Sequence, residues 1–200
     1  MRKIFLIFSP IIFTAFTTQS HFREQLSQAA ISLINPSVRY VADYVSIDYP
    51  NGDVPADTGV CTDVIIRAYR KLNIDLQKEV HEDMKKRFTQ YPKIWGLKTT
   101  DKNIDHRRVP NLQTFFKKHG KELSITQNPE DYQMGNIVTW MLPGNLPHIG
   151  IVIHKKSNDG KRPLIVHNIG KGQIAEDILF KYPITGHYFY QGKLTSQGNR

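Results

Sequence analysis

Hydrophobic residues recur at two different spacings along the chain. In the first part the apolar positions repeat every three or four residues, which predicts four helices, over residues 21–34, 61–72, 75–91 and 109–120. Further along, β-branched and aromatic residues are enriched and tend to alternate, which predicts four strands, over residues 136–142, 148–154, 163–170 and 182–194. Helices followed by a meander of strands indicate an α+β domain whose sheet packs on the helix that begins at Cys61.

The start of the chain has a different pattern. Arg2 and Lys3 precede an apolar run over residues 4–16, and small polar residues follow it. This order predicts a secretory signal peptide over residues 1–20 and a periplasmic or secreted protein. The run is short and contains Pro10, so no stable membrane span is expected after cleavage, and an uncleaved anchor is the alternative.

The remaining residues, 21–200, have the length of a single domain, with a helical and loop insertion at about 73–132. We expect this domain to be a monomer. The formal charge of the whole chain is +9, and it becomes +7 when the two basic residues of the leader are removed. This positive charge favours an anionic partner of the cell envelope. No nucleic acid is expected, because interleaved aromatic residues are absent from the two short basic runs, 85–87 and 106–108.

Cys61 is the only cysteine in the chain. In an exported protein a single cysteine forms no internal disulfide, so it is either buried and inert or retained for its chemistry. Its place at the start of a helix favours chemistry, since the helix dipole and the free N–H groups stabilise a thiolate. The same N–H groups can stabilise the oxyanion that forms when a nucleophile attacks a carbonyl.

Two histidines in the predicted strands could serve such a cysteine. Alternation places His148 and Gly150 on one side of their strand, where the glycine is expected to let the helix come close. If this strand forms a hairpin with the next, His167 lies beside His148. The alternatives are an ordinary residue at the start of a strand for His148 and a hydrogen-bonded core histidine for His167.

Several segments extend this interpretation: "GVCTDVIIRAYRKL", "NIDHRRVPNL", "HIGIV" and "VHNIG". Together they resemble the DUF1287 family of exported bacterial proteins, which is similar to the NlpC/P60 group of the papain-like fold. The resemblance implies Cys61 as nucleophile, His148 as general base and His167 as the third residue, with Asn168 as the alternative. Typical NlpC/P60 members have Asp–Cys–Ser at the nucleophile, whereas here Asp63 lies two positions after the cysteine.

The remaining candidates are residues for the oxyanion or the substrate. Tyr49 is a candidate oxyanion donor, and Asp63 marks the departure from the NlpC/P60 pattern. A polar loop adds Asp105, His106, Arg107 and Arg108, of which either arginine could bind a substrate carboxylate. The alternative for this loop is an internal network of ion pairs. No metal or other cofactor is expected, because the histidines and acidic residues lack metal-site spacing.

These observations predict an exported cysteine hydrolase of the thiol protease type. Its expected substrate is an amide bond in the stem peptides of peptidoglycan, cleaved by a Cys–His–His mechanism, as the NlpC/P60 resemblance implies. An acyltransferase or esterase with the same site is one alternative. A cell-wall binding module with an inert cysteine is the other.

Overall fold

The computed structural model describes residues 11–193, with side chains from residue 18 onward. Its main helices are α1 (Ile11–Ile31), α2 (Cys61–Arg70), α3 (Leu76–Arg87) and α4 (Val109–His119). The last three match the predicted helices closely. The first begins ten residues earlier than predicted, inside the expected signal peptide. Residues 1–10 of that leader lie outside the described residues, and its cleavage stays a prediction. Within residues 11–193, no helix is long and apolar enough to cross a membrane.

Six strands form one antiparallel sheet in the order β3-β8-β4-β5-β6-β7. They are β3 (Lys121–Glu122), β4 (Ile137–Leu142), β5 (Leu146–Lys156), β6 (Pro163–Asn168), β7 (Gln173–Glu176) and β8 (Ile184–Phe189). A second, parallel pair joins β1 (Arg39–Tyr40) to β2 (Thr58–Gly59). The predicted strands are therefore present. The very short β1, β2 and β3 and the four-residue β7 were not predicted, because segments of this length leave no clear alternation.

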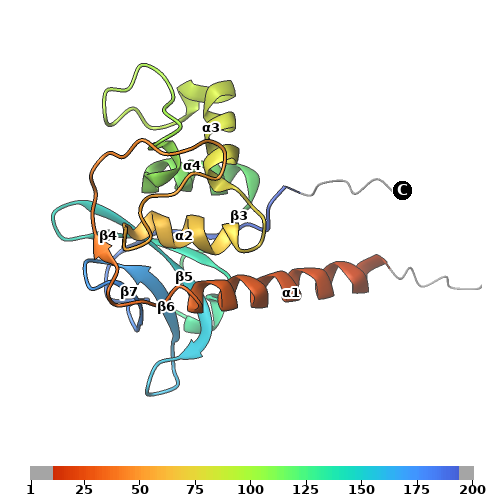
Figure 1. Cartoon of the computed structure of the whole chain (residues 1–200). Helices are drawn as coiled ribbons and strands as arrows, with labels where there is room; N and C mark the ends of the chain where they lie inside the picture. The colour runs from red at the N-terminus through yellow and green to blue at the C-terminus, as the bar shows by residue number, and fades with distance from the viewer. Residues whose placement is uncertain (1–10, 194–200) are drawn as a thin grey trace, which may run out of the picture.

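The helices α1, α2 and α4 pack on β5, near the middle of the sheet, and α3 lies beyond α2 (Figure 1). Three short 3-10 turns complete the described part of the chain: η1 (Phe88–Gln90), η2 (Asp105–Arg107) and η3 (Pro129–Asp131). The predicted α+β class and the packing of the sheet on the helix of Cys61 are confirmed at this level.

Both faces of the sheet are apolar, and the two faces of β5 belong to different clusters. Ile149, Ile151 and Ile153 join the core beneath the helices, together with Val64 and Ile65 of α2. On the opposite face a second cluster contains Val138, Trp140, Val152, Ile165 and Leu179. Because side chains alternate along a strand, His148 and Gly150 share the face of Val152, away from the body of α2.

The expected role of Gly150 was therefore wrong. A Cβ added at this glycine would lie 2.5 Å from Ile165 Cγ2 and 3.3 Å from His167 Cβ, both on the neighbouring strand β6. The glycine thus makes room for the side chains of β6 on the far face of the sheet, and does not serve the approach of the helix.

Candidate active site

Cys61 is the first residue of α2, and only 4% of its surface is exposed. Backbone N–H groups of Thr62 and Ile149 donate to the thiol, and the hydroxyl of Tyr40 is hydrogen-bonded to it. These bonds favour the thiolate, but burial outweighs them and, with the nearby Asp63 carboxylate, raises the pKa of Cys61 to about 12. The resting cysteine is therefore a neutral thiol.

The helix α2 contacts both β5 and β6. Pairing of β5 with β6 ends at Ile151 and Val166. Beyond that point the side-chain amide of Asn168, at the end of β6, donates to the carbonyl of Gly59 at 3.1 Å. The chain that leads into α2 therefore lies against the end of β6. Ile149, whose backbone N–H bonds the thiol, belongs to the core beneath the helices and directly follows His148.

His148 begins a chain of three hydrogen-bonded side chains. Its Nε2 lies 3.0 Å from His167 Nδ1, and His167 Nε2 lies 3.1 Å from Glu176 Oε2. Both imidazoles are buried, with 2% and 0% of their surface exposed. Burial lowers the pKa of His148 to about 3, with a smaller contribution from His167, so that His148 is a neutral base at rest. Burial likewise lowers the pKa of His167, although Glu176 opposes this.

The predicted neighbourhood of the two histidines is confirmed, and the structure separates them from the alternative third residue. The side-chain oxygen of Asn168 accepts from Gly170 N–H, while its amide holds Gly59. Asn168 thus shapes the loop before the cysteine, and His167 is the residue bonded to His148. Their roles in catalysis remain predictions.

Glu176 was missed by the sequence analysis, although the strand pairing gives a clear signal once it is known. Glu176 lies opposite Ile165, two residues from His167 on β6. Residues two apart on a strand share a face, and a directly paired residue shares it too. The carboxylate therefore lies diagonally across from His167, on the same face.

Tyr40, and not the predicted Tyr49, contacts the thiol. Tyr40 lies on β1, where it pairs with Gly59 of β2. The ring of Tyr49 packs against His81 instead, with 5.3 Å between the ring centroids. No pattern in the sequence distinguishes the two tyrosines, because the position of Tyr40 depends on the pairing of two short, distant segments, Tyr40 with Gly59.

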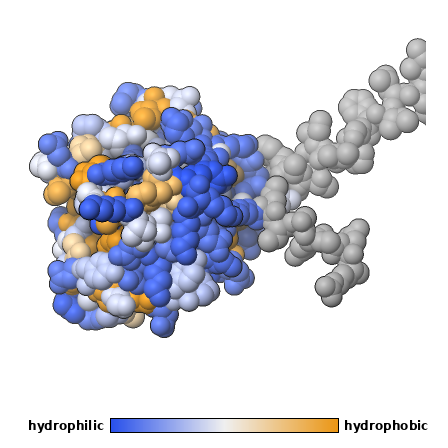
Figure 2. Space-filling model, turned by 90° about the horizontal axis from the view of Figure 1, so that it is seen from above, coloured by the Kyte–Doolittle hydropathy of each residue, from blue (hydrophilic) through white to orange (hydrophobic). Residues whose placement is uncertain are grey.

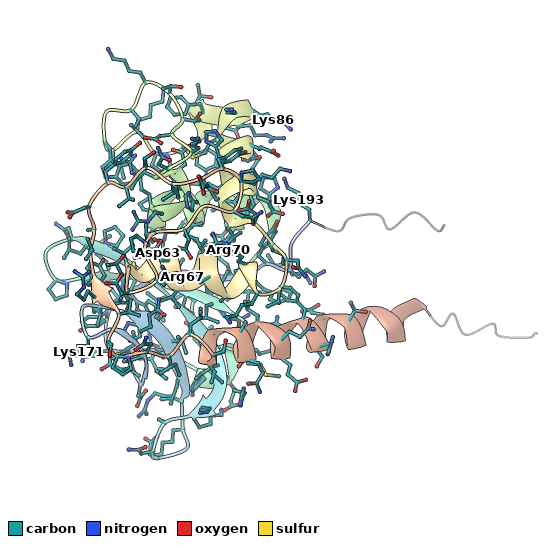
Figure 3. The ribbon with its side chains drawn as sticks, viewed as in Figure 1. Asp63, Arg67, Arg70, Lys86, Lys171 and Lys193 are labelled. Carbon is teal, nitrogen blue, oxygen red and sulfur yellow. The ribbon has the colours of Figure 1, made fainter. Side chains whose placement is uncertain are left out.

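Asp63 forms a buried ion pair with Arg107. Arg107 Nε and Nη2 donate to the two carboxylate oxygens at 2.9 and 3.0 Å, and Asp63 also accepts the N–H of Val60 at 2.7 Å. The hydroxyl of Thr62 donates to the Arg107 carbonyl at 3.0 Å. Asp63 marks the start of α2 in Figure 3, with Arg67 and Arg70 further along the helix. For Arg107 the structure therefore supports the internal ion-pair network over a substrate clamp.

Of the other loop candidates, Asp105 and Arg108 have structural partners. Asp105 is fully buried, and its Oδ2 lies 3.0 Å from His81 Nδ1. His106 is buried as well, which lowers its pKa to about 3. The guanidinium of Arg108 lies over the ring of Trp95, 4.1 Å from its centroid. Within the described part of the chain, no group of three or more His, Cys, Asp or Glu residues could hold a metal ion.

The face of the molecule seen in Figure 2 is mainly hydrophilic, with small apolar patches between the polar side chains. A groove of about 1510 Å³ lies between α1 and α3 and is lined by Glu79 and Lys193 among others, but not by Cys61 or His148. Since only 4% of the surface of Cys61 is exposed, access to the thiol requires local movement, for which Tyr40 is a candidate.

Fold and geometry define an α+β protein with a buried cysteine at a helix start, beside a His–His–Glu chain. The chain belongs to the family described as "Domain of unknown function (DUF1287)", whose model matches residues 27–190. It is 48% identical over 177 residues to the uncharacterized protein YijF of Escherichia coli (strain K12), covering 88% of this chain and 86% of that protein.

Two crystal structures of an N-acetylmuramoyl-L-alanine amidase from Bacteroides uniformis ATCC 8492 are similar at 14% identity. Each comparison covers 84% of this chain and 97% of the other, with TM-scores of 0.47 and 0.49. At these values the likeness assigns no activity to this chain.

Proposed function

We propose that this protein is a cysteine hydrolase that cleaves an amide bond. The observation that carries the proposal is the His148–His167–Glu176 chain, which ends next to the residue whose backbone N–H bonds the Cys61 thiol. A nucleophile, a base and a group that orients the base are the parts that covalent catalysis needs.

The proposed reaction starts from a neutral Cys61 thiol and a neutral His148 imidazole. His148 Nε2 is engaged with His167, so Nδ1 is the nitrogen left to accept a proton from the thiol. As sulfur bonds to the substrate carbonyl carbon, the thiol proton passes to His148. His148 then donates it to the leaving amine as the carbon–nitrogen bond breaks. Water, deprotonated by the same imidazole, releases the acyl group and restores the thiol.

The oxyanion would form at the start of α2. The backbone N–H of Cys61 is at the N-terminus of the helix, where the first N–H groups have no partner within the helix. Tyr40 is the further donor that we propose, since its hydroxyl is already within hydrogen-bonding reach of the sulfur. It takes the place of Tyr49, whose ring lies against His81.

For the substrate we propose a stem peptide of peptidoglycan. The support is the net positive charge, the leader-like start of the sequence and the NlpC/P60 resemblance of the segments around Cys61 and His148. The same support extends the proposal to a papain-like domain over residues 21–200 that acts in the periplasm or outside the cell.

The experiment is to incubate the purified mature protein, residues 21–200, with defined muropeptides and to identify products by mass. Wild type should release new amine and carboxyl ends, and the Cys61→Ala variant should release none while keeping the wild-type unfolding temperature. Equal hydrolysis by Cys61→Ala would refute the mechanism. A product joined to an added amine would indicate transfer in place of hydrolysis.

One observation favours a second candidate, a cell-wall binding module. The thiol is almost fully buried and its pKa is raised, which is typical of an inert structural cysteine. In that case the Cys61→Ala variant would bind purified peptidoglycan as tightly as wild type, and neither protein would release products.

A further inference from the structure

Resting on the proposed function, we propose that Glu176 is a positioning residue for catalysis. Through His167 it fixes which nitrogen of His148 carries the proton, and it leaves the lone pair of His148 on Nδ1. The side chain of Glu176 is 28% exposed, so the chain of hydrogen bonds runs from the buried His148 to the surface.

The tautomers follow from the carboxylate. An ionised carboxylate only accepts hydrogen bonds, so the proton of the 3.1 Å contact with Glu176 must lie on His167 Nε2. A neutral imidazole carries one N–H, so His167 Nδ1 is then an acceptor. The 3.0 Å contact between the rings therefore places a proton on His148 Nε2. His148 Nδ1 is left with its lone pair, as a general base requires.

Without the Glu176 carboxylate, neither of the two histidines sets the direction of the hydrogen bond between them. If His167 carried its proton on Nδ1, it would donate to His148 Nε2, and His148 would then carry its own proton on Nδ1. Such a ring cannot accept the thiol proton. The anion at the end of the chain excludes this arrangement.

The charges around His167 agree with this role. Lys171 Nζ lies 4.0 Å from Glu176 Oε1, so a positive charge lies beside the carboxylate. Lys171 and Lys181 both disfavour a positive charge on His167, and Glu176 favours it. When His148 takes the thiol proton, it becomes an imidazolium that donates to the neutral His167. The Glu176 carboxylate holds His167 in the orientation that accepts this bond, and so stabilises the positive charge on His148.

The test compares Glu176→Gln, Glu176→Ala and Glu176→Asp with wild type. Asp177→Asn is the matched control, because Asp177 is the next residue, has a similar side-chain exposure of 32%, and pairs with Arg162 away from the histidines. Two readouts are used: kcat and KM on the muropeptide that wild type cleaves, and the ¹H–¹⁵N spectrum of the His148 and His167 rings.

We expect Glu176→Gln and Glu176→Ala to lower kcat by about tenfold or more with KM nearly unchanged, a part of the roughly 10²–10⁴ that a positioned base contributes. Glu176→Asp should recover part of this loss, and Asp177→Asn should have no effect. In the spectrum, the hydrogen-bonded proton of His167 Nε2 should be present in wild type and lost in Glu176→Ala.

Wild-type kcat together with unchanged ring signals in Glu176→Gln and Glu176→Ala would overturn the proposal. If Glu176→Ala does not fold, the nearly isosteric Glu176→Gln decides. Hydrolysis that persists in Cys61→Ala would refute the proposed function, but it would not decide the tautomers of the two histidines. The ring spectrum would still test the tautomers, since it needs no substrate.

Discussion

Removing either partner of the Asp63–Arg107 pair should destabilise the protein strongly. Both side chains are 3% exposed and are joined by two hydrogen bonds of 2.9 and 3.0 Å. Loss of one partner leaves an uncompensated buried charge, so Arg107→Met should lower the free energy of unfolding by about 3–5 kcal/mol. Asp63→Asn should cost somewhat less, because its side-chain oxygen can still accept the N–H of Val60.

The assay is equilibrium unfolding in urea, followed by tryptophan fluorescence and by circular dichroism. The double variant Asp63→Asn/Arg107→Met should cost less than the sum of the two single variants, because the two groups share one interaction. Arg39→Met is a control, since its pair with Asp57 is about two-thirds exposed at both partners. Single-variant losses below about 1 kcal/mol, or strict additivity, would refute the view that this pair holds η2 to α2.

Three further predictions concern access, pH and the faces of the sheet. Tyr40→Ala should increase the rate of Cys61 alkylation several-fold at pH 8 because it uncovers the thiol, and Tyr49→Ala should not; equal rates in both variants would contradict the assignment of Tyr40. Burial lowers the pKa of both His148 and His106 to about 3, below the value of about 6.5 in the unfolded chain, so the unfolded state binds more protons between these values. The free energy of unfolding should therefore fall as the pH is lowered from 6.5 towards 3, by about 1.4 kcal/mol per pH unit for each group. Urea unfolding at pH 7, 5 and 4 should show that this free energy changes less steeply with pH in His106→Gln than in wild type. Gly150→Ala should lower the free energy of unfolding by about 1–3 kcal/mol, since its Cβ would meet Ile165 at 2.5 Å, and a neutral effect would contradict the packing of this face.

Much of the candidate site could be predicted from spacing. A helical period beginning at Cys61 placed the thiol at the N-terminus of a helix, and the two alternating segments with a turn between them brought His148 next to His167. These are short-range consequences of backbone geometry, since a helix repeats every 3.6 residues and a strand every two.

Other parts of the site depend on contacts between distant segments. Alternation shows which residues of β5 share a face but not which face the helix covers, and here both faces are apolar. Tyr40 and Glu176 lie on strands of two and four residues, too short for a readable period. Asp63 and Arg107 are 44 residues apart.

The sequence by itself therefore determined the class of fold, the helix start at the cysteine and the pairing of the two histidines. The tertiary structure alone decided that the thiol lies against Ile149 of β5, which tyrosine contacts it, and which carboxylate is bonded to His167. The physical reason is that local periods arise from each segment's own backbone. The partners of a buried polar group are set by whichever distant segment satisfies its hydrogen bonds.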